Sequence, residues 1–167
     1  ATGRYNFATT LTATIPGTVP ILIAAILDKD NHTAAAGILQ AFASSYCSFY
    51  YNSGVLYARW VASGTNDVPF AATMPTGKHV FWTYYDADPT TPKIHAGVDQ
   101  TENVAAAVAK NLSGFTFARN MYVGGDGSLT ATSKMQHGSL LVHGKAGLTQ
   151  ADALTLVGNM QTLQGIP

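Results

Sequence analysis

The stretch "GKHVFWTYYDADPTTPKIHAGVDQ", residues 77–100, decides the fold. Two runs of β-branched and aromatic residues, "HVFWTYY" and "KIHAGV", flank a patch of Asp, Pro and Thr. Such runs are typical of β-strands, and Pro89 and Pro92 would block ladder pairing between them. The stretch therefore predicts a β-hairpin whose loop is Asp86–Thr91.

The first strand of this hairpin is aromatic or apolar on both of its faces. Because side chains alternate along a strand, the two faces are Phe81, Thr83 and Tyr85 against Val80, Trp82 and Tyr84. In a sandwich of two sheets, one of these faces enters the core. The other face is either covered, by a loop or a subunit, or used to bind a ligand, and the sequence leaves both alternatives open.

The rest of the chain reads mostly as strands. Residues 19–27, "VPILIAAIL", form a continuous apolar run, which indicates a strand buried on both faces. "SYCSFYY" and "VLYARWVAS" alternate on either side of an "NSG" turn and predict a second hairpin. Later strands are expected in "FTFARNMYVGG" and "HGSLLVHG", a turn in "DKDNH", and a helix, strand or loop in "TENVAAAVAKN".

Only residues 148–164, "LTQADALTLVGNMQTLQ", have helical periodicity. Thr149 can cap the helix, and Asp152 places a favourable charge near its positive end. The expected apolar stripe consists of Ala153, Leu156, Val157, Met160 and Leu163.

About nine or ten short strands, separated by turn signals, indicate two packed sheets. We therefore predict an all-β fold, a two-sheet antiparallel sandwich with one short C-terminal helix, formed as a single domain by residues 1–167. Cys47 is the single cysteine, so no internal disulfide can form and the fold must rest on its core.

Composition excludes several kinds of partner. Charged residues make up 11% of the chain, and nine Lys and Arg balance nine Asp and Glu. A neutral chain does not attract a polyanion, so nucleic acid is not expected as a partner. The longest uncharged apolar stretch, residues 15–27, is too short for membrane insertion. The neutral surface, rich in Ala, Thr, Ser, Asn and Gly, favours an extracellular location or a virion surface.

"GKHVFWTYYDADPTTPKIHAGVDQTEN", residues 77–103, resembles the signature of laminin G-like, concanavalin A-like jelly-roll domains. A His-Val strand leads there to a Thr-Tyr-Asp turn and then to a strand of the form apolar-x-apolar-x-Gly. "MYVGGDGS" and "QHGSLLVHGKAGLTQADALTLV" are similar to the Gly-rich segment and the ending of these domains. The resemblance covers residues 77–160, with two departures: "AGVDQ" replaces the usual "VDG" hairpin, and "GSLLVHGK" lacks acidic and aromatic residues.

This resemblance implies a jelly-roll sandwich. Members of this superfamily, which also includes lectin- and glucanase-type sandwiches, are mostly non-catalytic modules that bind carbohydrates or proteins. Some members hold calcium, and some occur in phage tail and capsid proteins. The fold hosts many functions, so function has to be argued from a site.

The residues do not compose a recognisable catalytic centre. Glu102 is the one glutamate and has no acidic partner at a useful strand spacing, whereas glycoside hydrolysis needs two carboxylates. Cys47 lies in an alternating apolar strand, where it is expected to act as a small hydrophobe. A zinc site is not expected, because the histidines are scattered: His32, His79, His95, His137 and His143. We therefore expect the protein not to be an enzyme.

Calcium is the one cofactor for which weak candidates exist. Asp28 and Asp30 in "LDKDN" and Asp126 in "GGDGS" carry the hard oxygens that calcium prefers. The alternative is that these acids cap turns and that no cofactor is bound.

A glycan site combines an aromatic platform with Asp, Asn and backbone groups for the sugar hydroxyls. The expected rim consists of three polar stretches, residues 63–70, 86–92 and 124–128. The candidate ligand-binding residues are Trp60, Trp82, Tyr57, Tyr84, Asn66, Asp67, Asp86, Asp88 and Asp126. We interpret Asp86, Asp88 and Pro89 first as a hairpin bend and second as part of this site.

The sequence supports two candidate functions. The first is a non-catalytic recognition module that binds a glycan or cell-surface ligand through its loops and concave sheet. The alternative is a structural virion protein, such as a phage capsid decoration, tail-fibre or tailspike module, which assembles with other virion or cell-surface subunits or as a homo-oligomer. Oligomeric state discriminates between them.

Overall fold

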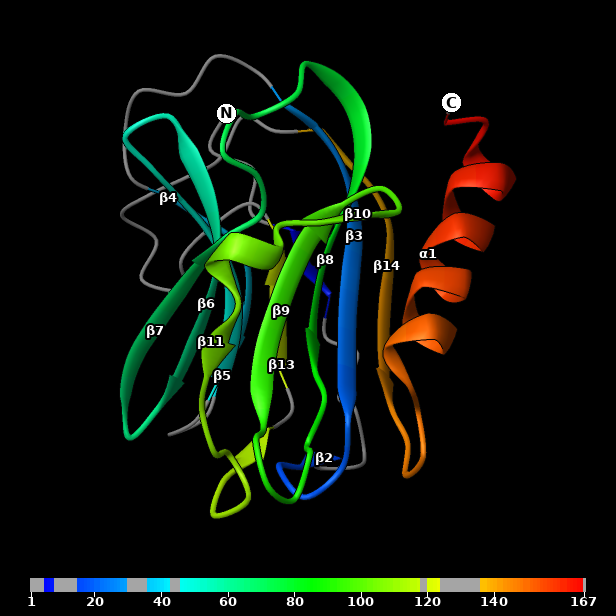
Figure 1. Cartoon of the computed structure of the whole chain (residues 1–167). Helices are drawn as coiled ribbons and strands as arrows, with labels where there is room; N and C mark the ends of the chain where they lie inside the picture. The colour runs from blue at the N-terminus through cyan, green and yellow to red at the C-terminus, as the bar shows by residue number, and fades with distance from the viewer. Residues whose placement is uncertain are drawn as a thin grey trace.

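The computed structural model describes residues 5–7, 15–29, 36–42, 46–117, 120–123 and 136–166. These residues form two stacked antiparallel sheets and one C-terminal helix, which lies beside the second sheet on the side away from the first (Figure 1). The predicted all-β sandwich with a C-terminal helix is confirmed.

Sheet I has six strands in the order β1-β13-β4-β5-β6-β7. Their bounds are β1 (Tyr5–Phe7), β13 (Asn120–Val123), β4 (Ala36–Phe42), β5 (Tyr46–Asn52), β6 (Val55–Ala62) and β7 (Gly64–Pro69). Ser53 and Gly54, with φ of 49° and 88°, join β5 to β6 in the predicted tight turn.

Residues 63–70 were predicted to form a loop of the ligand rim, but Gly64–Pro69 form the strand β7. Gly64 adopts a φ of 100°, which a glycine tolerates without steric cost, and it turns the chain back immediately after Ala62. The polar residues that follow therefore pair with β6 and form the edge strand of sheet I.

Sheet II has the order β10-β9-β8-β3-β14, with β11 also paired to β9 and a separate β12–β2 pair. The bounds are β10 (Thr101–Glu102), β9 (Lys93–Val98), β8 (Gly77–Tyr85), β3 (Ile21–Lys29), β14 (Gln136–Gly144), β11 (Val108–Ala109), β12 (Thr116–Phe117) and β2 (Ile15–Pro16). Residues 21–27 are all buried, as predicted for a strand covered on both faces. Asp28 and Lys29, expected in a turn, extend β3 instead.

The segment 101–111, for which the sequence left helix, strand and loop open, contains the 3-10 turn η1 (Val104–Ala106) between β10 and β11.

Among the residues that the structure describes, no helix has both the length and the apolar character that crossing a membrane requires.

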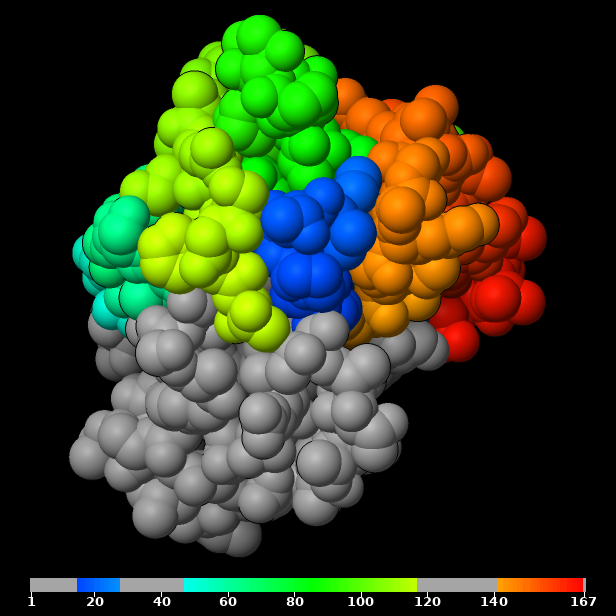
Figure 2. All heavy atoms as spheres, turned by 90° about the horizontal axis from the view of Figure 1, so that it is seen from below, coloured from blue at the N-terminus to red at the C-terminus, as the bar shows by residue number. Residues whose placement is uncertain are grey.

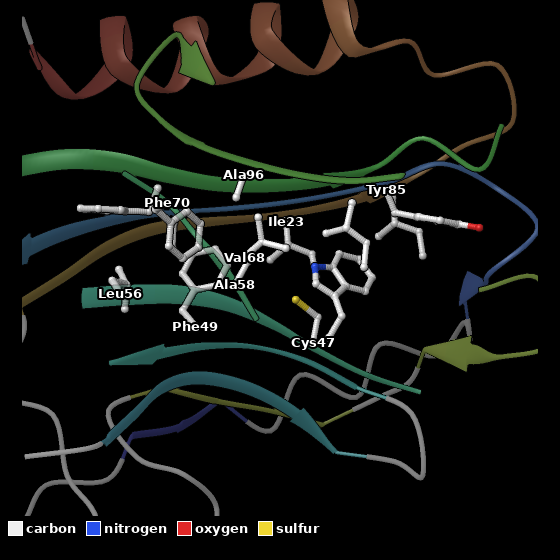
Figure 3. Close-up of a cluster of buried hydrophobic side chains, with 14 of the residues drawn as sticks. Ile23, Cys47, Phe49, Leu56, Ala58, Val68, Phe70, Tyr85 and Ala96 are labelled. Atoms are coloured by element: carbon white, nitrogen blue, oxygen red, sulfur yellow. The ribbon is translucent and has the colours of Figure 1, made fainter. Parts of the chain in front are cut away.

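The main core lies between the two sheets, where side chains from both point toward one another (Figure 3). Phe70 packs edge-on against Phe49 and Phe81, with ring centroids 4.6 and 5.6 Å apart. Cys47 also belongs to this core, and its burial raises the pKa of its thiol well above the ordinary value. Cys47 therefore packs as a small hydrophobe, as expected.

The helix α1 (Gln150–Gln164) forms a second core with the outer face of sheet II. Thr149 caps the helix, as predicted, and with Asp152 it forms a capping box, in which each side chain accepts a hydrogen bond from the other residue's backbone N–H. The buried helix residues are Ala153, Val157 and Gln161. These three residues are spaced four apart and form the row of α1 that faces the sheet. Leu163, which was predicted to belong to the apolar stripe, lies outside this row and is 81% exposed.

One end of the sandwich is closed by the segment that leads into β3. Figure 2 views this end and shows residues 15–20 beside the segment 110–116. The Gly17 N–H donates to the Phe115 carbonyl oxygen at 2.8 Å, and a Cβ at Gly17 would lie 1.9 Å from the Leu112 carbonyl oxygen. Only a glycine permits this close approach.

Candidate ligand-binding site

Three of the predicted aromatic platform residues are buried. Trp60 and Trp82 are 0% exposed, and Tyr84 is 1% exposed. An aromatic platform has to meet the ligand at the surface. The prediction that these three rings bind a ligand is therefore wrong.

Each buried ring instead has a structural partner for its polar atom. The Trp60 Nε1–H donates to Thr83 Oγ1 at 3.0 Å, which joins sheet I to sheet II. The Trp82 Nε1–H donates to the Asp99 carbonyl oxygen at 2.7 Å. The Tyr84 hydroxyl donates to the Leu148 carbonyl oxygen at 2.7 Å, and burial raises the pKa of Tyr84 to about 12. Buried polar atoms need such partners, so these contacts stabilise the fold.

Asp86 and Asp88 build the β8–β9 turn. Asp86 Oδ1 accepts from the N–H groups of Asp88 and Lys93, at 3.0 and 2.8 Å. Asp88 Oδ1 accepts from the N–H groups of Thr90 and Thr91, at 2.8 and 2.7 Å, and these bonds lower the pKa of Asp88. Both carboxylates are used as local turn acceptors, which supports the interpretation of this stretch as a bend.

Sequence reasoning missed a polar network on the helix side of sheet II. His95 Nδ1 lies 2.6 Å from Glu102 Oε1, and His95 Nε2 lies 3.3 Å from Asp86 Oδ2. The Gln150 side-chain amide donates to Glu102 Oε2 at 2.5 Å. The two carboxylates meet different nitrogens of the ring and do not converge on one point. This network therefore ties β9, β10, the β8–β9 turn and the start of α1 together.

The outer face of sheet I, away from the core, carries the most distinctive polar group. Arg59 on β6 pairs with Asp67 on β7 through two bonds of 2.7 Å, from Nε to Oδ1 and from Nη2 to Oδ2. The guanidinium lies 3.8 Å from the centroid of the Tyr50 ring on β5. A bidentate pair and a cation–π contact together fix the guanidinium in place. The two charged side chains remain 26% and 32% exposed.

Tyr57 lies on the same face as this pair, whereas Asn66 lies on the opposite face of β7, with the buried Val68. Tyr57 is half-buried and is the register partner of Tyr50, so both tyrosines lie on the outer face with Arg59. Asn66 is half-buried, and its side chain donates to the Trp60 carbonyl oxygen at 3.3 Å. The structure therefore brings together the predicted residues Tyr57 and Asp67, and adds Arg59 and Tyr50. A signal for Arg59 was present, because it is the one charged residue of β6 and lies between Tyr57 and Trp60 in the sequence.

Comparison with known proteins rests on structure alone, since no protein-family model and no curated protein matches the sequence. Domains LG4-5 of the mouse laminin α1 chain superpose with a TM-score of 0.59 at 18% identity, over 87% of this chain and 43% of that chain. The binding domain of botulinum neurotoxin serotype C1 superposes with a TM-score of 0.61 at 12% identity, over 86% of this chain and 37% of that chain. The Ruminococcus gnavus IT-sialidase CBM40 bound to α2,3-sialyllactose superposes with a TM-score of 0.56 at 11% identity, over 93% of this chain and 96% of that chain.

The fold is a laminin G-like jelly roll. The chain spans less than half the length of the laminin and neurotoxin chains that it matches, and nearly the whole of the CBM40 chain. At these identities the likeness establishes the fold, and the chemistry of this jelly roll has to come from its own residues.

Two hollows on this jelly roll lie away from Arg59. One, of about 320 Å³, is lined by His143 of β14, by the turn before α1, including Lys145, and by the first residues of α1, including Asp152. The other, of about 210 Å³, lies between Phe70 and Asn103. Ligand pockets are usually about 300–1,000 Å³ and mostly apolar. Neither of these two hollows includes Tyr57, Arg59 or Asp67.

The calcium candidates stay predictions. Asp30 and Asp126, with residues 124–128 of the expected rim, lie outside the described residues, and only the backbone of Asp28 is described. Among the residues that the structure does describe, no group of three His, Cys, Asp or Glu side chains could hold a metal ion.

Proposed function

We propose that this chain is a non-catalytic recognition module that binds a glycan through the outer face of sheet I, at Tyr57, Arg59 and Asp67. The observation that carries the proposal is the contrast between the two outer faces. α1 covers the outer face of sheet II, whereas the outer face of sheet I carries an ordered Arg–Asp pair beside half-buried tyrosines.

The chemistry of this group suits sugar hydroxyls. A hydroxyl both donates and accepts hydrogen bonds, and the pair places guanidinium N–H groups beside carboxylate oxygens, each of which can accept more than one hydrogen bond. The Tyr57 ring adds apolar area for the face of a sugar ring. Because the pair is already held across two strands, a ligand meets it without a large ordering cost.

The structural neighbours are consistent with such a role. Two of them are a neurotoxin binding domain and a carbohydrate-binding module with bound sialyllactose. An extracellular or virion-surface location belongs to the same proposal and fits the low charge of the chain.

A glycan array tests the proposal, with the wild-type chain, Tyr57→Ala and the control Leu163→Ala. Leu163 is an exposed apolar residue on α1, remote from sheet I, so its loss controls for general surface changes. We expect the wild type and Leu163→Ala to bind one glycan class equally, and Tyr57→Ala to bind it roughly 10-fold or more weakly. Equal binding by Tyr57→Ala, or no glycan bound by the wild type, would overturn the proposal.

The alternative function, a structural virion protein, predicts a different result. Light scattering coupled to size-exclusion chromatography would then show a stable homo-oligomer, and the array would show no binding. The low charge of the chain is the observation that favours this alternative.

A further inference from the structure

We infer that the glycan bound by the outer face of sheet I is uncharged, a neutral sugar and not a sialylated, sulfated or uronic-acid glycan. The inference rests on the proposed function and specifies its ligand class. Two observations support it.

The first observation is the charge content of the sheet. Across the six strands of sheet I, Arg59 and Asp67 are the only residues with a charged side chain. Arg59 and Asp67 cancel each other, so the strands of the sheet carry no net charge. A face that selects an anion would need uncompensated basic residues.

The second observation is the geometry of the pair. Both contacts of Asp67 are 2.7 Å and use two guanidinium nitrogens of Arg59, which is the fork that a ligand carboxylate would also use. An acidic sugar that used this Nε/Nη2 fork would have to displace Asp67, and its carboxylate would then lie beside the Asp67 carboxylate. Like charges at that distance disfavour binding, so the pair acts against anionic ligands.

The experiment compares neutral oligosaccharides with their sialylated counterparts on one array, for example lactose beside α2,3-sialyllactose. We expect the wild type to bind the neutral members, and to keep its affinity when NaCl is raised from about 50 to about 500 mM, because salt screens only charge-driven binding. Asp67→Asn removes the carboxylate from the fork of Arg59, and we expect it to gain about tenfold for sialylated members relative to neutral ones.

The double variant Arg59→Gln/Asp67→Asn is the matched control, since it removes both charges and should gain nothing for sialylated members. Preferential binding of sialylated members by the wild type would overturn this inference and leave the proposed function standing. If the wild type binds no glycan, both fail. If the double variant gains for sialylated members as Asp67→Asn does, the charge explanation is wrong.

Discussion

The two outer faces of this sandwich show how differently aromatic residues can be used. On sheet II, Val80, Trp82 and Tyr84 face outward from the main core and are sealed by α1. On sheet I, Tyr50 and Tyr57 remain half-buried. The most aromatic strand, β8, therefore lies in the sheet whose outer face is covered by the helix. The proposed ligand face instead carries a few aromatics beside one compensated charge pair.

Truncation of Trp82 gives the largest expected effect. Trp82→Ala leaves a cavity under α1 and removes the bond to the Asp99 carbonyl oxygen, so the free energy of unfolding should fall by about 3–5 kcal/mol. Urea denaturation followed by circular dichroism measures this loss. Tyr57→Ala is the control on the other face and should cost much less. A Trp82→Ala protein with unchanged stability and lost glycan binding would reverse our assignment of the two faces.

Alkaline pH tests the same covered face without a truncation. The pKa of Tyr84 is about 12 in the fold and near 10 when exposed, so the folded protein holds this proton more tightly. The contribution of the Tyr84 hydroxyl to the free energy of unfolding is therefore present below pH 10. It is lost as pH rises from about 10 to 12, by roughly 2–3 kcal/mol. Denaturation at a series of pH values measures it, and Tyr84→Phe should flatten the curve. An equally steep curve for Tyr84→Phe would assign the loss to other groups.

Gly97 tests how tightly Trp82 is packed. An added Cβ would lie 2.5 Å from Trp82 Cζ2 and 2.2 Å from the Thr101 carbonyl oxygen. Gly97→Ala should therefore destabilise the protein by about 1–3 kcal/mol, measured as a lower denaturation midpoint. Gly114→Ala is the matched control, since no atom lies within 4 Å of its added Cβ. Equal midpoints for the two variants would show that the packing around Trp82 is loose.

The sequence predicted the fold because the fold depends on local patterns. Alternation, continuous apolar runs and turn residues identify the two hairpins and β3, and the capping residues identify α1. The resemblance carried by residues 77–160 pointed to the same jelly roll.

The candidate site was predicted less well, because it depends on contacts between distant segments. Nothing in "HVFWTYY" indicates that α1, about 70 residues later in the chain, covers Trp82 and Tyr84. The pairing of Glu102 with His95 and Asp86 likewise requires three segments to meet. Asp67 and Tyr57 were in the predicted set, but Arg59 was not, since pairing was expected to end at residue 63.

The smallest expected effect on stability comes from the proposed site. Arg59→Gln breaks a partly exposed ion pair, and such pairs contribute at most about 1 kcal/mol to the free energy of unfolding. If the pair exists to bind a ligand, the same substitution should nevertheless weaken glycan binding by more than about tenfold. Titration calorimetry and urea denaturation of Arg59→Gln measure the two quantities on one protein. A large loss of stability with unchanged binding would mean that the pair holds the β6–β7 edge together. The outer face of sheet I would then be as structural as the face that α1 covers.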